Sequence, residues 1–181
     1  MTAIVWKGVE TASSESCRIE EGPRGVLVES RIHGGAAACS YTLRATEDWE
    51  FTGIVVRAGG RELHVRRTDR EWEVAGEARS DLRDAREVDI SASPFSNTLP
   101  IRRLRLDVGE SADIITAYIR IPELDVTPDP QRYTRISENE YLYESRDSDF
   151  RRSLTVDGDG LVVEYPGLFT RAEDEPPLAP Q

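Results

Sequence analysis

The chain has 181 residues, the usual length of one domain, and its hydrophobic fraction of 38% and charged fraction of 31% suit a compact soluble protein. A formal net charge of -11 repels phosphate backbones and anionic headgroups, which argues against nucleic-acid binding and against docking on an anionic membrane. The sequence has neither a secretory leader nor an apolar stretch of the ~18 residues that a membrane span needs, so we expect a cytoplasmic protein with no membrane span.

Short runs rich in Val, Ile, Tyr and Thr, separated by Gly, Pro and Asp, predict β-strands along the first half of the chain. In the run 25–33, Val26, Val28, Ser30 and Ile32 alternate with Leu27, Glu29 and Arg31, which places the first four on one face. The predicted strands are 3–9, 16–20, 25–33, 37–46, 49–57, 61–68 and 71–75.

One segment breaks the strand pattern and predicts a helix. Ser93 is a good N-cap and Pro94 is suited to a first helical turn, but Pro100 cannot continue a regular helix. We therefore expect a short helix, or two half-helices, over 94–104, with strand again by Leu106.

The second half returns to the strand pattern. Strands are predicted at 111–121, 131–137, 141–146, 150–156 and 161–165, and Pro122, Pro128 and Pro130 predict an ordered connection before residue 131. Strands at such regular spacing favour a mainly β fold built as one long antiparallel meander, which must curl to hide its apolar face. Without repeats or linkers, residues 1–171 should form a single domain, followed by an acidic, Pro-rich, disordered tail at 172–181.

Motifs of catalysis are missing from the sequence. His33 and His64 have no partner at metal-ligand spacing, and there is no nucleophile elbow, phosphate loop or dinucleotide fingerprint. Cys17 and Cys39 should stay as buried thiols, and the run 157–160 is better explained as a hairpin turn than as a calcium loop. We therefore expect no catalytic residue, no metal and no cofactor, with an enzyme of unrecognised type as a remote alternative.

Two groups of residues are candidates for binding. Arg102 and Arg103 stand in an otherwise apolar segment, where each needs a carboxylate, a carbonyl or an anionic ligand as its partner. Tyrosines gather in the last 50 residues, and a tyrosine ring with its polar tip suits amphipathic ligands and sugar faces. The ordinary alternatives are an internal ion pair for the arginines and sheet packing for the tyrosines.

The same residues carry a family resemblance. The run DISASPFSNTLPIRRL at 89–104, followed by QRYTRI at 131–136, YLYES at 141–145 and the segment 156–169, resembles the bacterial "putative glycolipid-binding" family. The resemblance runs from Trp6 to Phe169. It implies a spiral β-roll of about fifteen strands around a single helix, forming homodimers, and similar in shape to periplasmic lipoprotein carriers that hold acyl chains in an open half-barrel.

The leading hypothesis is therefore non-enzymatic binding of an amphipathic ligand, a lipid or glycolipid, in the concave interior of the roll. Its expected contacts are Asn97, Arg102, Arg103, Tyr133, Tyr143 and Tyr165. In this hypothesis Arg102 or Arg103 meets a polar or anionic head, and apolar strand faces take the acyl part. The alternative is a structural or protein-interaction module whose core is filled by side chains.

Overall fold

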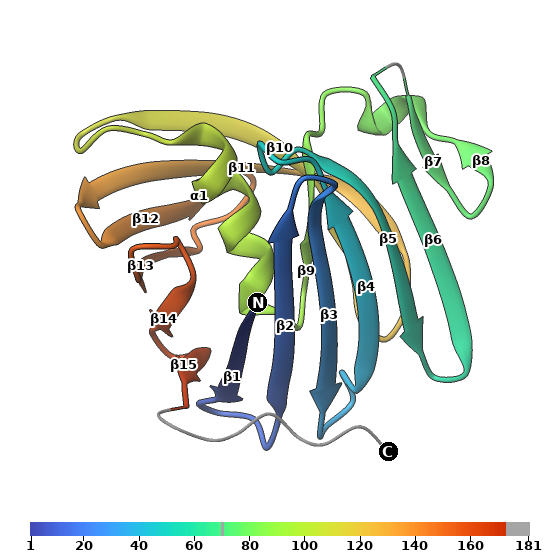
Figure 1. The fold of residues 1–181 in the computed structure, drawn as a ribbon, viewed down its shortest axis with the longest axis horizontal. Helices are drawn as coiled ribbons and strands as arrows, with labels where there is room; N and C mark the ends of the chain where they lie inside the picture. The colour runs from blue at the N-terminus through green and yellow to red at the C-terminus, as the bar shows by residue number, and fades with distance from the viewer. Residues whose placement is uncertain (70, 173–181) are drawn as a thin grey trace.

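The computed structural model describes residues 1–69 and 71–172, and within them fifteen strands form one curled sheet (Figure 1). The first eight strands are β1 (Thr2–Gly8), β2 (Ser14–Gly22), β3 (Gly25–His33), β4 (Cys39–Ala45), β5 (Phe51–Ala58), β6 (Arg61–Arg67), β7 (Trp72–Val74) and β8 (Glu77–Ala78). A short 3-10 helix, η1 (Ser80–Leu82), precedes β9 (Glu87–Ile90). The remaining strands are β10 (Ser111–Ile119), β11 (Val126–Ser137), β12 (Glu140–Ser145), β13 (Arg151–Val156), β14 (Val162–Tyr165) and β15 (Phe169–Arg171).

The predicted fold class is confirmed, but the connectivity differs from one continuous meander. The strand order is β8-β7-β6-β5-β4-β3-β2-β1-β15-β14-β13-β12-β11-β10-β9, so two meanders meet where β1 pairs with β15. All neighbours are antiparallel except β9 and β10, which are parallel. The alternation predicted for 25–33 is confirmed, since Val26, Val28, Ser30 and Ile32 are all buried on β3.

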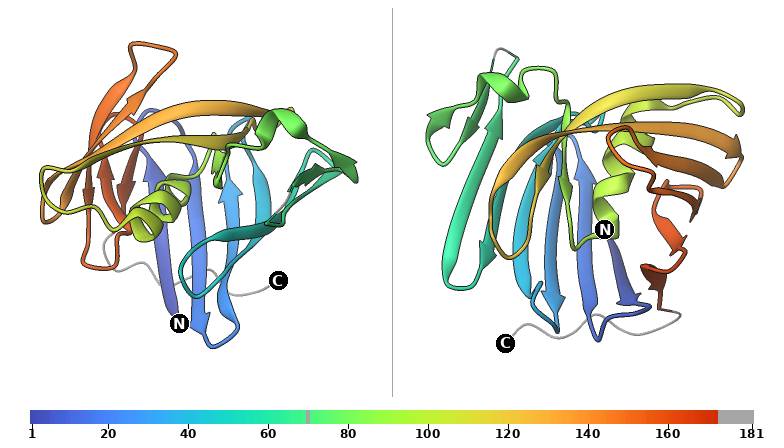
Figure 2. Two further views of the ribbon diagram at one scale, coloured as in Figure 1. Left: turned by 90° about the horizontal axis from the view of Figure 1, so that it is seen from above. Right: turned by 180° about the vertical axis from the view of Figure 1, so that it is seen from behind.

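The helical segment lies on the concave side of the sheet, inside its curve (Figure 2). It consists of a 3-10 helix, η2 (Pro94–Asn97), that runs directly into α1 (Thr98–Leu104), as the expectation of two half-helices required. Ser93 caps η2 by accepting a hydrogen bond from the backbone N–H of Phe95. Pro100 fits because it is the third residue of α1, where no backbone N–H is needed for the helix.

Side chains fill most of the space between the helical segment and the sheet. Phe95 and Leu99 point from it into a core built on the N-terminal meander, and both are fully buried. A second core on the C-terminal meander packs Ile101 against tyrosines and aliphatic side chains of β11 to β14. The interior of the roll is thus a packed core in large part, not an empty half-barrel.

The predicted connection around the prolines is wrong in part, because Pro122 lies between β10 and β11 but β11 begins at Val126 and contains both Pro128 and Pro130. These prolines pair with β10 on one side, whereas the pairing with β12 starts only at Gln131. On the β12 side, the carbonyl of Pro130 still accepts a hydrogen bond from the backbone N–H of Arg146. Because the β12 pairing begins only at Gln131, the missing N–H of each proline is tolerated.

The end of the described chain remains attached to the sheet. Ala172 donates its backbone N–H to the carbonyl of Val5 on β1. Ala172 is the first residue of the predicted disordered tail, 172–181; the rest of that tail, 173–181, lies outside the described residues. In the part of the chain that the structure describes, no helix is long and apolar enough to cross a membrane.

Candidate functional site

A cavity of about 320 Å³ opens on the concave side of the C-terminal meander. We call it the aromatic cavity. Its walls come from β9 to β12, β14, β15, η2 and the segment before it, and the β12–β13 and β14–β15 turns. Its aromatic lining is Tyr118, Tyr143, Phe150, Tyr165 and Phe169, and its acidic lining is Asp89, Asp129 and Asp147.

The aromatic wall is a chain of ring contacts. Tyr143 lies with its ring centroid 5.9 Å from that of Phe150 and 6.5 Å from that of Tyr165, and Tyr165 is 6.4 Å from Phe169. Tyr143 and Tyr165 are only 8% and 7% exposed, and burial raises the pKa of both phenols. Neither hydroxyl has a hydrogen-bond partner among the described residues, so both are available to a ligand in the cavity they line.

Tyr133 supports this wall from behind. The β11–β12 register places it opposite Tyr143, and the two rings meet edge to face at 5.5 Å. Its hydroxyl donates to Oδ1 of Asn97 at 2.9 Å. Nδ2 of Asn97 donates to the Pro94 carbonyl, so the orientation of this side chain in the cavity wall is fixed from two sides.

Two carboxylates form a polar side of the cavity. Asp89 accepts from the hydroxyl of Ser96 at 2.8 Å and from Nε2 of Gln131 at 2.7 Å. The same Nε2 lies 2.6 Å from Oδ2 of Asp129. Burial raises the pKa of both carboxyls, and the charge of Asp89 contributes to the rise at Asp129. Neither Asp89 nor Asp129 has an ion-pair partner in the described ranges.

The predicted binding residues separate into two groups. Asn97, Tyr143 and Tyr165 meet in the aromatic cavity, with Tyr133 directly behind it. Arg102 and Arg103 lie outside it, so the expected contact of an arginine with a head group in the same place is not formed.

Both arginines are held by neighbouring groups, which was the ordinary alternative. Arg103 binds Glu87 through two hydrogen bonds of 2.6 and 2.9 Å, and Glu87 is fully buried. Arg102 lies over the ring of Trp49, 4.6 Å from its centroid, and donates to Glu21 and to the backbone carbonyl of Asp159, each at 3.0 Å.

The sequence interpretation missed Asp89, Tyr118, Asp129 and Phe150. Asp89 opens the signature run at 89–104, but nothing in the run itself distinguishes it from other acids of the chain. A signal did exist on β11, because residues 129, 131 and 133 share one face of a strand. Recognising it required the strand to continue through Pro130, which the predicted boundary at 131 prevented.

A buried glutamate lies next to the cavity. Glu15 on β2 accepts hydrogen bonds from Ser30 at 2.6 Å, from Tyr41 at 2.7 Å and from Ser93 at 2.8 Å. Burial raises the pKa of Glu15 to about 7, because it outweighs these hydrogen bonds. Ser93 also lines the aromatic cavity, so this network connects the cavity wall to the N-terminal meander.

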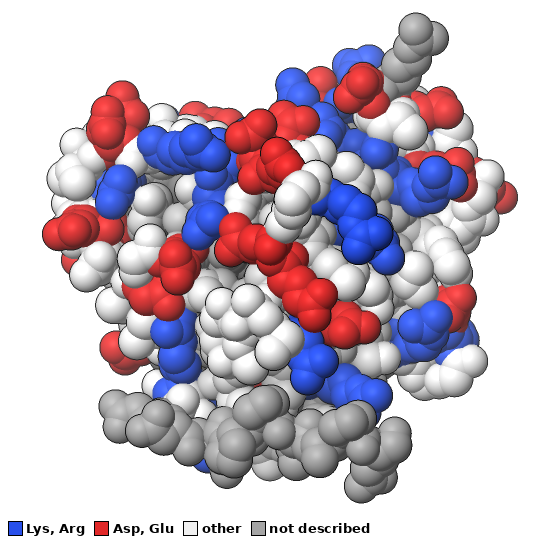
Figure 3. All heavy atoms as spheres, viewed as in Figure 1, with Lys and Arg blue, Asp and Glu red and all other residues white. Residues whose placement is uncertain are grey.

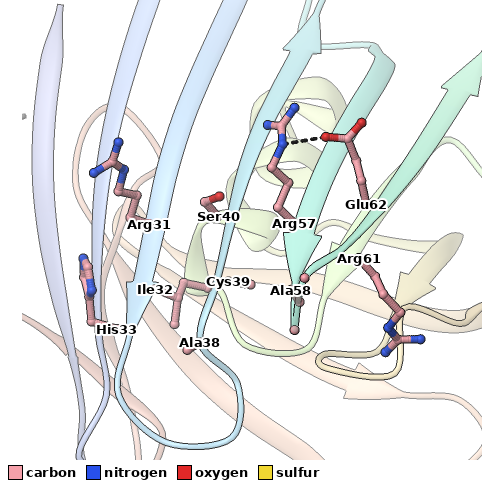
Figure 4. A pocket seen from close by; sticks show the side chains of 12 residues that line it. Arg31, Ile32, His33, Ala38, Cys39, Ser40, Arg57, Ala58, Arg61 and Glu62 are labelled. Carbon is pink, nitrogen blue, oxygen red and sulfur yellow. Dashed lines mark ion pairs between the residues drawn. The ribbon is translucent and has the colours of Figure 1, made fainter. Parts of the chain in front are cut away.

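A larger depression of about 540 Å³ lies at the rim of β3, β4 and the β5–β6 turn (Figure 4). The guanidinium groups of Arg31, Arg57 and Arg61 point in different directions there. Arg57 pairs with Glu62, and Arg61 donates to the carbonyl of Pro122 at 2.7 Å. This rim depression offers no set of converging, uncommitted groups, so we take the aromatic cavity as the candidate site.

Surface charge does not single out another site on the face drawn in Figure 1. Figure 3 shows acidic and basic side chains interspersed over that face. The net negative charge of the chain, -11, therefore does not form one continuous acidic patch on that face.

Comparisons with known proteins agree with the fold described above. The model of a family described as "Putative glycolipid-binding" matches residues 3–171. The crystal structure of a DUF1089 family protein from Pseudomonas aeruginosa is similar to this chain at 34% sequence identity, covering 87% of this chain and 92% of that one, with a TM-score of 0.75. A search of curated proteins found no match. The predicted resemblance is confirmed, and the family description supports a binding role.

Proposed function

This chain belongs to the family described as "putative glycolipid-binding", and we propose from that premise that it binds an amphipathic ligand without changing it chemically. The polar head of the ligand, a sugar in the case of a glycolipid, occupies the aromatic cavity. The single observation that carries this proposal is that Asn97, Tyr143 and Tyr165 line one cavity, where the two tyrosine hydroxyls have no hydrogen-bond partner among the described residues.

The chemistry of the cavity suits a head rich in hydroxyl groups. Aromatic rings stack against the apolar faces of such heads, while carboxylate and phenol oxygens accept hydrogen bonds from their hydroxyls. The volume of about 320 Å³ is near the lower end of the ~300–1,000 Å³ that ligand sites usually have. The cavity therefore holds a head group and not an entire lipid.

The apolar part of the ligand has a surface at the edge of the same cavity. Leu168 is 39% exposed, and the neighbouring Phe150 and Phe169 are half-buried. All three line the cavity. An alkyl chain lying across them gains about 25 cal/mol for each Å² of apolar surface removed from water. The sequence suggested that the acyl chain is enclosed inside the roll. Because side chains fill that core, we place the alkyl chain on the surface at the edge of the cavity instead.

The filled core also favours a second candidate function. A structural or protein-interaction module needs no cavity beyond packing defects, and Phe95, Leu99 and Ile101 fill the concave side in the way such a module would. A homodimer, as the resemblance implies, is compatible with both functions and stays a prediction.

The experiment that separates these functions is titration of the purified protein with n-octyl β-glucoside below its critical micelle concentration. We expect saturable binding by calorimetry and a rise in melting temperature. Tyr165→Phe removes one uncommitted hydroxyl and should weaken binding roughly 3- to 10-fold, the range of ~0.5–1.5 kcal/mol per hydrogen bond. Tyr141→Phe is the matched control, because Tyr141 belongs to the same sheet but does not line the aromatic cavity.

The proposal fails if no alkyl glycoside binds saturably and solvent extraction of the purified protein yields no lipid. It also fails if Tyr141→Phe weakens binding as much as Tyr165→Phe, because the ligand would then lie elsewhere.

A further inference from the structure

Every charged side chain that lines the aromatic cavity is acidic. Asp89 comes from β9, Asp129 from β11 and Asp147 from the β12–β13 turn, and the described lining contains no Lys or Arg. A cavity built only for neutral hydroxyl groups would not need this imbalance of charge.

The two inner carboxylates are bound only by neutral donors. The hydroxyl of Ser96 and the amide of Gln131 supply the side-chain hydrogen bonds to Asp89, and the same amide binds Asp129. Two arginines close to these carboxylates in sequence are engaged elsewhere, since Arg132 and Arg146 both pair with Asp113. A partly buried carboxylate without a counterion is costly, and a cation in the cavity would remove that cost.

The aromatic wall gives an independent reason to expect a cation. Ring faces attract organic cations, and a set of tyrosines around a cavity is a known way to hold an ammonium group. One ring of this wall already binds a cation of the chain itself, because the guanidinium of Arg152, which does not line the cavity, lies 4.8 Å from the centroid of Phe150. Tyr143 and Tyr165 are each more than nine-tenths buried as residues, and their hydroxyl oxygens, without a partner among the described residues, are further acceptors for N–H groups.

We propose that the head group selected by the aromatic cavity carries a positively charged amine, a primary or quaternary ammonium, and that anionic heads are rejected. This inference rests on the proposed function and adds the charge of the ligand to it. It reverses the sequence-based hypothesis of an arginine that meets an anionic head, because Arg102 and Arg103 lie outside the cavity and are already paired.

The test compares probes that share one eight-carbon chain and differ only in the head. Octylammonium, octyltrimethylammonium, n-octyl β-glucoside and octyl sulfate are titrated by calorimetry below their critical micelle concentrations, at low and at moderate salt. We expect at least one of the two ammonium probes to bind 10-fold or more tightly than the glucoside, with an advantage that shrinks as salt is added. Octyl sulfate should show no saturable binding.

Variants locate the effect in the cavity. Asp89→Asn and Asp129→Asn should each weaken ammonium binding about 10-fold while glucoside binding changes less than 3-fold. Asp147→Asn tests the same idea at an exposed position, where a failure to fold is not a concern. Asp48→Asn is the matched control, because it changes the net charge equally but lies outside the cavity, between β4 and β5.

The outcomes distinguish this inference from the function on which it rests. If the glucoside binds and neither ammonium probe binds more tightly, the charge inference is overturned and the proposed function stands. If no probe binds, the charge inference is overturned, and the proposed function fails with it when solvent extraction of the purified protein also yields no lipid. An equal loss of ammonium affinity in Asp48→Asn, or full competition by millimolar calcium chloride, would also overturn it, since the attraction would then be general or belong to a metal ion.

Discussion

Replacing Glu15 with glutamine should remove a specific pH dependence from the stability of this protein. Glu15 is 2% exposed, and its carboxylate accepts hydrogen bonds from Ser30, Tyr41 and Ser93. Glutamine has nearly the same shape and imitates the protonated acid. Its carbonyl can accept from Ser30 and Tyr41 while its amide donates to Ser93.

The size of the effect follows from the pKa of Glu15, which burial raises from an ordinary 4.5 to about 7. Since one pKa unit corresponds to ~1.4 kcal/mol, ionising this group costs about 3 kcal/mol more in the folded protein than in the unfolded chain. A raised carboxyl pKa means that the folded state binds the proton more tightly. The stabilising contribution is therefore complete below pH 4.5 and is lost as the pH rises through about 7.

The assay is urea denaturation of the wild type and Glu15→Gln at intervals from pH 4 to pH 9. The free energy of unfolding of the wild type relative to the variant should fall by about 3 kcal/mol between pH 4.5 and pH 8. Glu20→Gln is the matched control, because Glu20 lies exposed on the same strand. A difference that is flat with pH, or that grows in the wild type's favour as the pH rises, would refute the assignment of Glu15 as an uncompensated buried acid.

Three further outcomes are expected at pH 7. Arg103→Ala leaves Glu87 buried without its partner and should lower the free energy of unfolding by about 3–5 kcal/mol in urea denaturation. Arg102→Ala removes a partly exposed ion pair and should lower it clearly less, so equal losses would contradict the difference in burial. Leu99→Ala should cost about 2–5 kcal/mol by the cavity it opens, and a loss under 1 kcal/mol would mean that the helical segment is not tightly packed. Ser93→Ala removes both the cap of η2 and a hydrogen bond to Glu15, for which we expect a loss of ~1–3 kcal/mol in thermal or urea unfolding; an unchanged stability would argue against both contacts.

Much of the fold was predictable because its signals are local. Alternation on β3 and the N-cap at Ser93 each depend on a few neighbouring residues, and both are confirmed. The pairing of β1 with β15 depends instead on contacts between the two ends of the described chain, which no local pattern encodes. The boundary of β11 was mispredicted for a related reason. Prolines are tolerated inside this strand only because its pairing with β12 stops at Gln131, which depends on the position of another strand.

The candidate site was predictable only in part, for a physical reason. Tyr143 and Tyr165 were found because tyrosines cluster in the last 50 residues, and Asn97 was found through the family resemblance of the run 89–104. Asp89 and Asp129 belong to a set of 34 acidic residues, and only burial in three dimensions distinguishes them. The arginines attracted notice through their apolar neighbours, but the same setting is produced by an internal ion pair.

The neighbouring positions of β1 and β15 in the middle of the sheet have a consequence for biosynthesis. Trp6 pairs opposite Arg171, so β1 leaves the ribosome long before β15 and has a bare edge until Arg171 has been made. Contacts of such long sequence separation slow folding, and an open strand edge is a template for pairing with other chains. Nascent copies of this protein should therefore be most prone to aggregation during translation, and least so once the β14–β15 hairpin has paired with the open edge of β1.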